Sequence, residues 1–261
     1  MLNNLKKFVK GGLSRIRRKH SPRFNYKFYK TPYKLQKLGT EYGGWIIPVD
    51  IVHKDSICYL AGAGEDISFD ISLAKKFHCN IFIFDPTPRA KAHFEQVLEA
   101  AESGVSEYTH AKTKYDLSRG IRSYMHFDEL GIWKKHDLLR FFVPKDSSHI
   151  SHSITNLQNT DNYIEVSVER LNDIMKMKGH SHLDILKLDI EGAEFDVIDS
   201  IIEDRINIHI LCVEFHNQGK NGLDQIQSSI NKLAANNYAV IARENLDLTF
   251  INKSFGHLAS K

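Results

Sequence analysis

The stretch CYLAGAGEDISFD, from Cys58 to Asp70, constrains the fold more than any other part of the chain. A short apolar run ends in Gly62-Ala63-Gly64, two acids follow, and a helical pattern then begins. A glycine turn between a strand and a helix is how α/β proteins hold a nucleotide-like ligand. The stretch therefore predicts a parallel sheet whose first strand ends at a ligand-binding loop.

The loop does not fit a dinucleotide. The dinucleotide fingerprint is G-x-G-x-x-G, and its third glycine allows close packing of helix and strand. Ile67 stands at that third position, and Glu65 and Asp66 stand where a pyrophosphate would approach. Carboxylates beside two phosphates repel them unless the carboxylates are paired. The loop therefore favours a ligand that has no pyrophosphate and that carries cationic character.

Strands and helices alternate after this loop, which indicates a single α/β domain with helices on both faces of a mostly parallel sheet. Thr87 and Pro88 predict the start of one helix, and Ser167 and Gly179 predict the two ends of another. A C-terminal hairpin is expected to place one antiparallel strand in the sheet. The expected strands are 57–61, 80–85, 123–127, 163–166, 182–189, 207–215, 238–243 and 246–252, the expected helices are 67–78, 88–101, 168–178, 191–202 and 222–237, and residues 131–144 are expected to form a hairpin insertion.

The net charge of +3 conceals an uneven distribution. Residues 1–40 contain 12 Lys and Arg and no Asp or Glu, whereas residues 41–261 contain 23 basic and 32 acidic residues. We therefore expect a basic N-terminal arm, residues 1–40, in front of a mildly acidic domain, residues 41–261. Apolar residues at helical spacing favour an anionic membrane surface or acidic glycolipid as the partner of residues 1–34. Self-association is the alternative, and nucleic acid is not the expected partner.

Composition places the chain among ordinary globular proteins, since 42% of its residues are hydrophobic and 26% are charged. No apolar run approaches the roughly 20 residues that a membrane-spanning helix needs, and no signal-peptide pattern is seen. The cysteines Cys58, Cys79 and Cys212 follow no metal-ligand spacing, which favours buried thiols in a reducing compartment. We expect a cytoplasmic protein that is peripheral at the inner face of the membrane.

Ligands of such sheets bind beyond the carboxyl ends of the strands, so the strand ends supply the candidate site residues. The first strand end gives Ala61 and the glycines that follow it, which let the backbone approach a ligand. The second gives Asp85 and Pro86. An acid at this position is placed to accept two hydrogen bonds from a ribose diol, and capping the following turn is its alternative role.

The third strand end is expected to lie beside an adenine ring. The exocyclic amine of adenine needs an acceptor, for which Asp128 or Glu129 is available, and its faces need apolar contacts. Gly131 follows directly, with Leu130 or Ile132 as the apolar partner.

The fourth and fifth strand ends carry most of the charge. Lys187 and Asp189 interrupt an apolar strand in LDILKLDIEGAEFDVI, with Glu191 close behind. Charges inside a covered strand need a reason. They either pair with each other or line a pocket around a cation and a nucleophile. The fifth strand ends in CVEFH, where a period of two places Glu214 and His216 on one face.

Four segments together resemble the FkbM-like S-adenosylmethionine-dependent methyltransferases: AGAGEDISFD, FDPTP, LKLDIEGAEFDVI and CVEFH. The resemblance runs from about Tyr42 to Phe250 and includes YGGW, and KLDIEGAE is its most specific part. It implies the class I methyltransferase fold, which is Rossmann-like and has a seven-stranded sheet with an antiparallel last strand. It also implies O-methylation of hydroxyl groups on sugars, polyketides and other secondary metabolites, for example in glycan biosynthesis.

The chain departs from the pattern at Leu60, where many class I methyltransferases carry an acid. The resemblance then implies that Glu65 or Asp66 holds the amino-acid end of the cofactor. S-Adenosylmethionine carries a sulfonium and an ammonium group and no phosphate. Carboxylates beside the loop are therefore attractive to it, and the missing third glycine needs no explanation.

Direct displacement is the expected mechanism, in which the acceptor oxygen attacks the methyl carbon in line with the departing sulfur. Asp189 or His216 is expected to remove the hydroxyl proton, and Glu191 and Glu214 are expected to orient the acceptor. No metal site is predicted. A divalent ion bridging Asp189 and Glu214 stays open as an alternative, although no ligand spacing requires it.

Two other functions are alternatives to methyl transfer. An NAD-dependent oxidoreductase is disfavoured by Ile67 in place of the third glycine. A non-catalytic membrane-associated protein with a degenerate cofactor fold is disfavoured by the acids retained at three strand ends, Asp85, Asp189 and Glu214.

Overall fold

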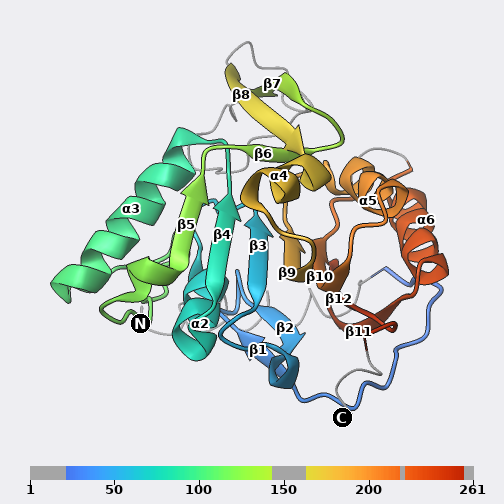
Figure 1. Ribbon diagram of the computed structural model, residues 1–261, viewed down its shortest axis with the longest axis horizontal. Helices are drawn as coiled ribbons and strands as arrows, with labels where there is room; N and C mark the ends of the chain where they lie inside the picture. The colour runs from blue at the N-terminus through green and yellow to red at the C-terminus, as the bar shows by residue number, and fades with distance from the viewer. Residues whose placement is uncertain (1–21, 143–162, 218–220, 256–261) are drawn as a thin grey trace, which may run out of the picture.

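The protein is built around a seven-stranded sheet (Figure 1), seen in a computed structural model that describes residues 22–142, 163–217 and 221–255. Six of the seven strands are parallel, and β12 runs antiparallel to both of its neighbours. The predicted mostly parallel sheet with a C-terminal hairpin is therefore confirmed. Across the sheet the strands follow the order β11 (Tyr238–Glu244), β12 (Asp247–Asn252), β10 (Ile208–Glu214), β9 (Leu183–Leu188), β3 (Ile57–Ala61), β4 (Asn80–Phe84) and β5 (Met125–Asp128).

Alternate residues of the central strands β10, β9, β3 and β4 enter two separate cores, one on each face of the sheet. On β3, Cys58 and Leu60 pack into one core, whereas Tyr59 and Ala61 pack into the other. Helices α2 (Ser68–Phe77) and α3 (Pro88–Ser103) cover the first face. Helices α4 (Leu171–Lys178), α5 (Glu194–Glu203) and α6 (Gly222–Ala235) cover the second. Because helices cover both faces, the central strands between them are nearly continuous apolar runs.

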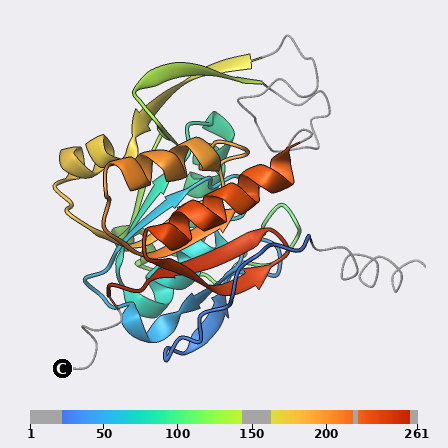
Figure 2. The ribbon, with the colours of Figure 1, turned by 90° about the vertical axis from the view of Figure 1, so that its right-hand side faces the viewer.

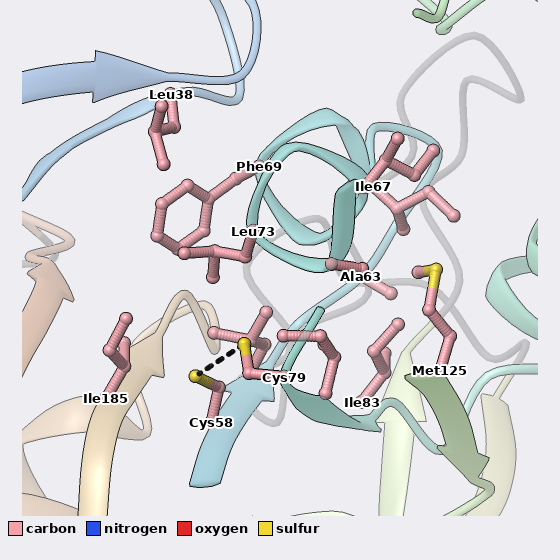
Figure 3. Packing of buried hydrophobic residues seen from close by; sticks show 14 of the residues in the cluster. Leu38, Cys58, Ala63, Ile67, Phe69, Leu73, Cys79, Ile83, Met125 and Ile185 are labelled. Carbon is pink, nitrogen blue, oxygen red and sulfur yellow. Dashed lines mark hydrogen bonds between the residues drawn. The ribbon is translucent and has the colours of Figure 1, made fainter. Parts of the chain in front are cut away.

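The three cysteines are free and fully buried: Cys58 lies in β3, Cys212 in β10, and Cys79 directly before β4. Figure 3 shows Cys58 and Cys79 facing each other in the first core, with 3.9 Å between their sulfur atoms. Burial raises the pKa of the Cys212 thiol to about 12. These thiols therefore act as packing atoms, as the sequence analysis expected.

The first described residues lie against the C-terminal end of the domain (Figure 1). The Tyr29 amide donates to the Val240 carbonyl over 2.8 Å, and the Arg243 guanidinium donates to the Pro22 carbonyl over 2.8 Å. Strand β1 (Leu35–Leu38) then pairs antiparallel with β2 (Trp45–Pro48), and a 3-10 turn follows at Val49–Ile51. The predicted boundary after residue 40 falls between β1 and β2. Residues 1–21, where most of the predicted basic arm lies, are outside the described residues.

The predicted hairpin at residues 131–144 is wrong in its pairing. Strands β6 (Gly131–Trp133) and β7 (Asp137–Phe142) do not pair with each other, because β8 (Tyr163–Arg170) lies between them. β6 is parallel to β8 and β7 is antiparallel to it. The paired β7 and β8 project beyond the sheet (Figures 1 and 2). Residues 143 and 144 lie outside the described ranges.

The predicted helix cap at Ser167 is also wrong. Val166 and Val168 on either side of it are buried, and this alternation continues β8 as far as Arg170. The other predicted cap positions are confirmed. Thr87 accepts a hydrogen bond from the Ala90 amide, and Gly179 ends α4 in the left-handed conformation.

Two further boundaries shift for backbone reasons. A 3-10 turn at Ile121–Tyr124 replaces the expected start of the third strand, so β5 begins at Met125. The helix expected from residue 191 begins only at Glu194, because Glu191 and Gly192 have positive φ angles of 52° and 101°. A positive φ is incompatible with a right-handed helix. Within the described ranges, every helix is too short or too polar to span a bilayer.

Candidate active site

A cavity opens at the carboxyl ends of β3, β4, β9 and β10, where the topology places ligand sites in such sheets. The glycine loop forms one wall, and the tips of β9 and β10 form a second. Residues of β6, β7 and β8, which we call the β6–β8 insertion, form the third wall. Its lining includes Tyr42, Gly43, Gly44, Trp45, Gly62, Ala63, Gly64, Glu65, Asp66, Asp85, Pro86, Thr87, Arg89, His110, Gly131, Ile132, Phe141, Val168, Lys187, Asp189, Ile190, Glu191, Glu214 and Asp247. Most of the predicted site residues therefore meet in one place.

The glycine loop is held against the tip of β9. Gly62 has φ of +83°, and a Cβ atom there would lie 1.8 Å from the carbonyl oxygen of Asp189. Only glycine fits this contact. Gly64 also has a positive φ, of +50°, but a Cβ atom there would meet nothing within 4 Å. The first glycine therefore serves the packing of the loop on β9, and the second leaves open space toward the cavity.

Asp85 fastens the glycine loop from the tip of β4. Its Oδ2 atom accepts hydrogen bonds from the amides of Ala63 at 3.0 Å and Gly64 at 3.1 Å. Its Oδ1 atom accepts from the amide and the hydroxyl of Thr87, at 2.9 and 2.6 Å. Four donors fill the acceptor capacity of one carboxylate. The structure thus gives Asp85 the alternative capping role, and its contact with a ribose stays a prediction.

The two acids after the loop have partners of their own. Glu65 forms a bidentate ion pair with Arg89, with both N–O distances 2.8 Å, and lies 3.3 Å from His110 Nδ1. The Asp66 carboxylate accepts from the Thr40 hydroxyl at 2.8 Å and from the Ser68 amide at 3.0 Å. Both acids line the cavity. Arg89 and His110, which contact Glu65, come from other segments of the chain, so no local sequence pattern indicates these contacts.

Three predicted cofactor contacts do not reach the cavity wall. Ala61 is fully buried inside the sheet, and its carbonyl accepts from the Asp189 amide at 3.1 Å. Asp128 pairs with Lys178 of α4 at 2.9 Å, and Glu129 pairs with Lys91 of α3. These lysines draw the two acids toward the flanking helices. The apolar residues Pro86, Gly131 and Ile132 line that part of the cavity instead, and Leu130 packs against the second core.

The tips of β9 and β10 bring three predicted residues together. Asp189, Glu214 and His216 each offer a ligand atom within 4.8 Å of the others. Glu214 and His216 therefore lie on one side of their strand end, as a period of two predicted. Asp247, which the sequence analysis missed, joins them from β12, where it is paired in register with Glu214. An antiparallel strand begins at the edge where its parallel neighbours end, which is the signal that identifies Asp247.

Crowding of these carboxyl groups changes their proton affinity. Burial raises the pKa of Glu214 to about 9, and the charges of Asp189 and Asp247 add to the effect. Burial and Asp189 likewise raise the pKa of Asp247 to about 6. The carboxyl group of Glu214 therefore keeps its proton at neutral pH.

His216 is surrounded by carboxylates. Its Nε2 atom lies 3.3 Å from Glu191 Oε2, and its Nδ1 atom lies 3.4 Å from Glu194 Oε1. Burial lowers the pKa of His216, but the contact with Glu194 and the charges of Glu191, Glu194 and Glu214 outweigh burial and raise the pKa to about 9. Glu194 itself is fully buried and accepts from the backbone amides of Gly192 and His216. It thereby joins the turn after β9 to the end of β10.

Lys187 is the buried cation at the centre of the site. Its ammonium group donates to the Gly62 carbonyl at 2.6 Å and forms an ion pair with Asp189 Oδ2 at 3.2 Å. Burial lowers the pKa of Lys187, but the charges of Asp189 and of Asp70 in α2 outweigh burial and raise it. The pairing alternative for Lys187 and Asp189 is confirmed, and the pair also lies in the cavity wall.

The strand order, the glycine loop after the first strand and the antiparallel β12 beside β10 define the class I methyltransferase fold. The family model described as Methyltransferase FkbM domain matches residues 64–240, which is more than half of the chain. The chain therefore belongs to the FkbM methyltransferase family.

Individual relatives are distant. Methyltransferase 1 of Beauveria bassiana (strain ARSEF 2860) is 24% identical over 169 residues, covering 58% of this chain and 67% of that protein. Among solved structures, precorrin-6y C5,15-methyltransferase of Geobacter metallireducens GS-15 aligns with a TM-score of 0.42 and 11% identity, covering 77% of this chain and 82% of that one. TYW2 of M. jannaschii, in complex with AdoMet, aligns with a TM-score of 0.33 and 10% identity, covering 87% and 89%.

Proposed function

We propose that the protein transfers a methyl group from S-adenosylmethionine to a hydroxyl oxygen of a sugar, glycan or other metabolite. The observation that carries this proposal is the single cavity shared by the glycine loop and the carboxyl groups of β9 and β10. Membership of a methyltransferase family supplies the reaction class. The carboxyl groups supply acceptors for a hydroxyl donor.

The residues around the cavity fit this cofactor. The loop after β3 approaches the cavity through its backbone, because the space beside Gly64 is open. The acids that line the cavity favour a ligand with positive charges, whereas a pyrophosphate would meet Asp66, which has no cationic partner among its described contacts; Glu65 is already paired with Arg89. When bound, S-adenosylmethionine supplies an electrophilic methyl group. Pro86, Gly131 and Ile132 offer apolar contacts for the faces of its adenine ring.

Asp189 is the group that we assign to the hydroxyl proton. As the carbon–oxygen bond forms and the carbon–sulfur bond breaks, the acceptor hydroxyl loses its proton, which passes to the Asp189 carboxylate. His216 suits this role less, because its raised pKa of about 9 leaves the imidazole protonated at neutral pH. Glu214 also holds a proton there, so it is able to donate a hydrogen bond to the acceptor or to Asp189.

The charge of the acceptor end favours an uncharged acceptor. Asp189, Glu191, Glu214 and Asp247 line it, and Lys187 is already engaged by Gly62 and Asp189. A phosphate or carboxylate on the acceptor would meet these acids without a free cation among the described lining residues of β9 and β10. Sugar hydroxyls carry no charge and donate hydrogen bonds to carboxylates, which supports this acceptor class.

Cofactor binding is tested by thermal unfolding of the full chain with S-adenosylmethionine, S-adenosylhomocysteine or NAD. A ligand present at 100 times its dissociation constant stabilises the folded state by about 2.7 kcal/mol. We expect the Tm to rise with the two sulfur compounds and to stay unchanged with NAD. A rise with NAD alone would overturn the assignment of the cavity. No rise with any of the three would favour the non-catalytic alternative.

The bond that is formed is tested separately with S-adenosylmethionine that carries a ¹³C-labelled methyl group. The protein is incubated with glycan and small-molecule fractions of a cell extract, and products are examined by ¹³C NMR, which separates methyl groups on oxygen, nitrogen and carbon. We expect label on ether oxygen that survives mild alkali. Label on nitrogen or carbon, or as an alkali-labile ester, would contradict O-methylation of a hydroxyl and leave methyl transfer intact.

A further inference from the structure

We propose that Asp189, Glu214 and His216 bind a divalent metal ion at the acceptor end of the cavity. The three residues come from the tips of two adjacent parallel strands, β9 and β10. Their ligand atoms lie within 4.8 Å of one another, which is the spacing of groups around one cation after a small contraction. The role of the ion rests on the proposed function, but its binding does not.

The balance of charge at this place favours a cation. Carboxyl groups outnumber the cationic side chains among the described residues here, and several are screened from water. The cationic side chains are Lys187 and His216, and the acidic ones are Asp189, Glu191, Glu194, Glu214 and Asp247. Two negative carboxylates at close distance cannot both stay charged in a partly buried site without a compensating charge. The compensation is either protons or a metal ion, and the geometry is suitable for the metal.

The surroundings of the His216 imidazole also suit a metal ligand. Its Nδ1 atom is buried and has no hydrogen-bond partner, although Glu194 Oε1 lies 3.4 Å away. Its Nε2 atom lies 3.3 Å from Glu191 Oε2. A metal-bound imidazole usually has a carboxylate beside its other ring nitrogen. Whichever nitrogen of His216 binds the ion, a glutamate faces the remaining one.

The ligand types narrow the choice of ion. Two carboxylates and one imidazole suit Mn²⁺, Fe²⁺ or Zn²⁺ better than a soft ion that prefers thiolates, and the three cysteines are buried. Three protein ligands leave coordination positions open. Asp189 and Glu214 line the cavity, so an ion held by them would border the space in which we propose that the acceptor binds. The ion would thus hold a hydroxyl oxygen of the acceptor and place it before Asp189.

The test measures Mn²⁺ binding by the full chain after treatment with a chelator, without cofactor or acceptor. Free Mn²⁺ gives an EPR signal that is lost on binding, so titration yields the number of sites and the dissociation constant. We expect one site in the unchanged protein. Glu214→Gln and His216→Gln should each weaken binding at least about 10-fold, since loss of groups that only support the ligands costs that much.

Glu129→Gln is the matched control, because Glu129 directly follows β5, the edge strand three strands away from β9, and pairs with Lys91 outside the cavity. We expect its Mn²⁺ affinity to equal that of the unchanged protein. The Tm shift with S-adenosylhomocysteine, measured in EDTA, reports whether each variant retains a folded cavity.

Absence of Mn²⁺ and Zn²⁺ binding by the unchanged protein would overturn the inference. Mn²⁺ binding by Glu214→Gln and His216→Gln that equals binding by the Glu129→Gln control would overturn it as well, because the ion would then lie elsewhere. Failure of the metal site is distinguishable from failure of the proposed function. A protein that is stabilised by S-adenosylhomocysteine in EDTA and binds no metal keeps the proposed function and loses only this inference.

Discussion

Asp189→Asn is expected to lower methyl transfer by about 10²- to 10⁴-fold, which is the usual contribution of a general base. The asparagine amide has nearly the same shape as the carboxylate but does not take a proton. The glycine loop keeps its contact with the Lys187 ammonium through the Gly62 carbonyl. Cofactor binding should therefore persist, and the Tm shift with S-adenosylmethionine should remain.

The measurement compares initial rates of label transfer from S-adenosylmethionine, using the acceptor fraction that the unchanged protein methylates. Asp199→Asn is the control, because Asp199 lies on α5 and pairs with Lys232 at the surface. Normal turnover in Asp189→Asn would remove Asp189 from the mechanism and return the proton to His216 or to solvent. Loss of the Tm shift would instead mean that Asp189 holds the cofactor.

Glu214→Gln separates the two tasks that meet at this strand tip. The substitution removes a proposed metal ligand and leaves the Asp189 carboxylate in place. Glu214 already carries a proton at neutral pH when no metal is bound, because its pKa is raised to about 9. A glutamine there resembles the metal-free state, so we expect its rate to equal that of the unchanged protein in EDTA, and a further loss would mean that Glu214 has a role besides metal binding.

The glycine turn and the acids at the strand ends could be predicted from the sequence because both depend on local patterns. Gly62 and Gly64 mark a strand–helix turn, and the acids at the tips of β9 and β10 follow apolar runs directly. The carboxyl ends of parallel strands meet at one edge of the sheet, so these residues had to converge. His216 and Glu214 followed from the period of a strand.

The errors arose where pairing across the chain decides the outcome. Asp128 and Glu129 stand at a strand end like Asp85, but Lys178 and Lys91 from two helices draw them away from the cavity. Asp85 instead turns inward and accepts hydrogen bonds from two amides of the glycine loop. No local pattern reports such a choice of partner.

The β6–β8 insertion illustrates the same limit. Its two short strands, β6 and β7, are separated by only three residues, which favoured a hairpin between them. The residue pattern of β6 and β7 does not predict that β8, which comes later in the chain, pairs with both of them. This pairing brings Val168 beside Gly131, where a Cβ atom would approach the valine side chain to 2.8 Å. The insertion thereby becomes a wall of the cavity.

Lys187→Met is expected to destabilise the protein by about 3–5 kcal/mol, the usual effect of removing one partner of a buried ion pair. Methionine fills a similar volume but carries no charge. Lys187 is only 5% exposed, and its loss leaves the carboxyl groups of Asp189 and Asp70 without their cation. The Gly62 carbonyl also loses its 2.6 Å hydrogen bond, so cofactor binding should weaken together with stability.

Urea denaturation gives the free energy of unfolding, and Lys232→Met provides the matched control. Lys232 pairs with Asp199 at 2.6 Å on the surface, where such a pair contributes about 0–1 kcal/mol. Asp70→Asn combined with Lys187→Met should recover part of the loss, because Asp70 is 2% exposed and would no longer be an unpaired buried carboxyl group. Equal losses for the two lysine variants, or no recovery in the double variant, would show that Lys187 does not organise this site by its charge. The expected recovery would instead show that the Lys187 ammonium group compensates the buried carboxyl group of Asp70, in addition to its contacts with the Gly62 carbonyl and Asp189 Oδ2.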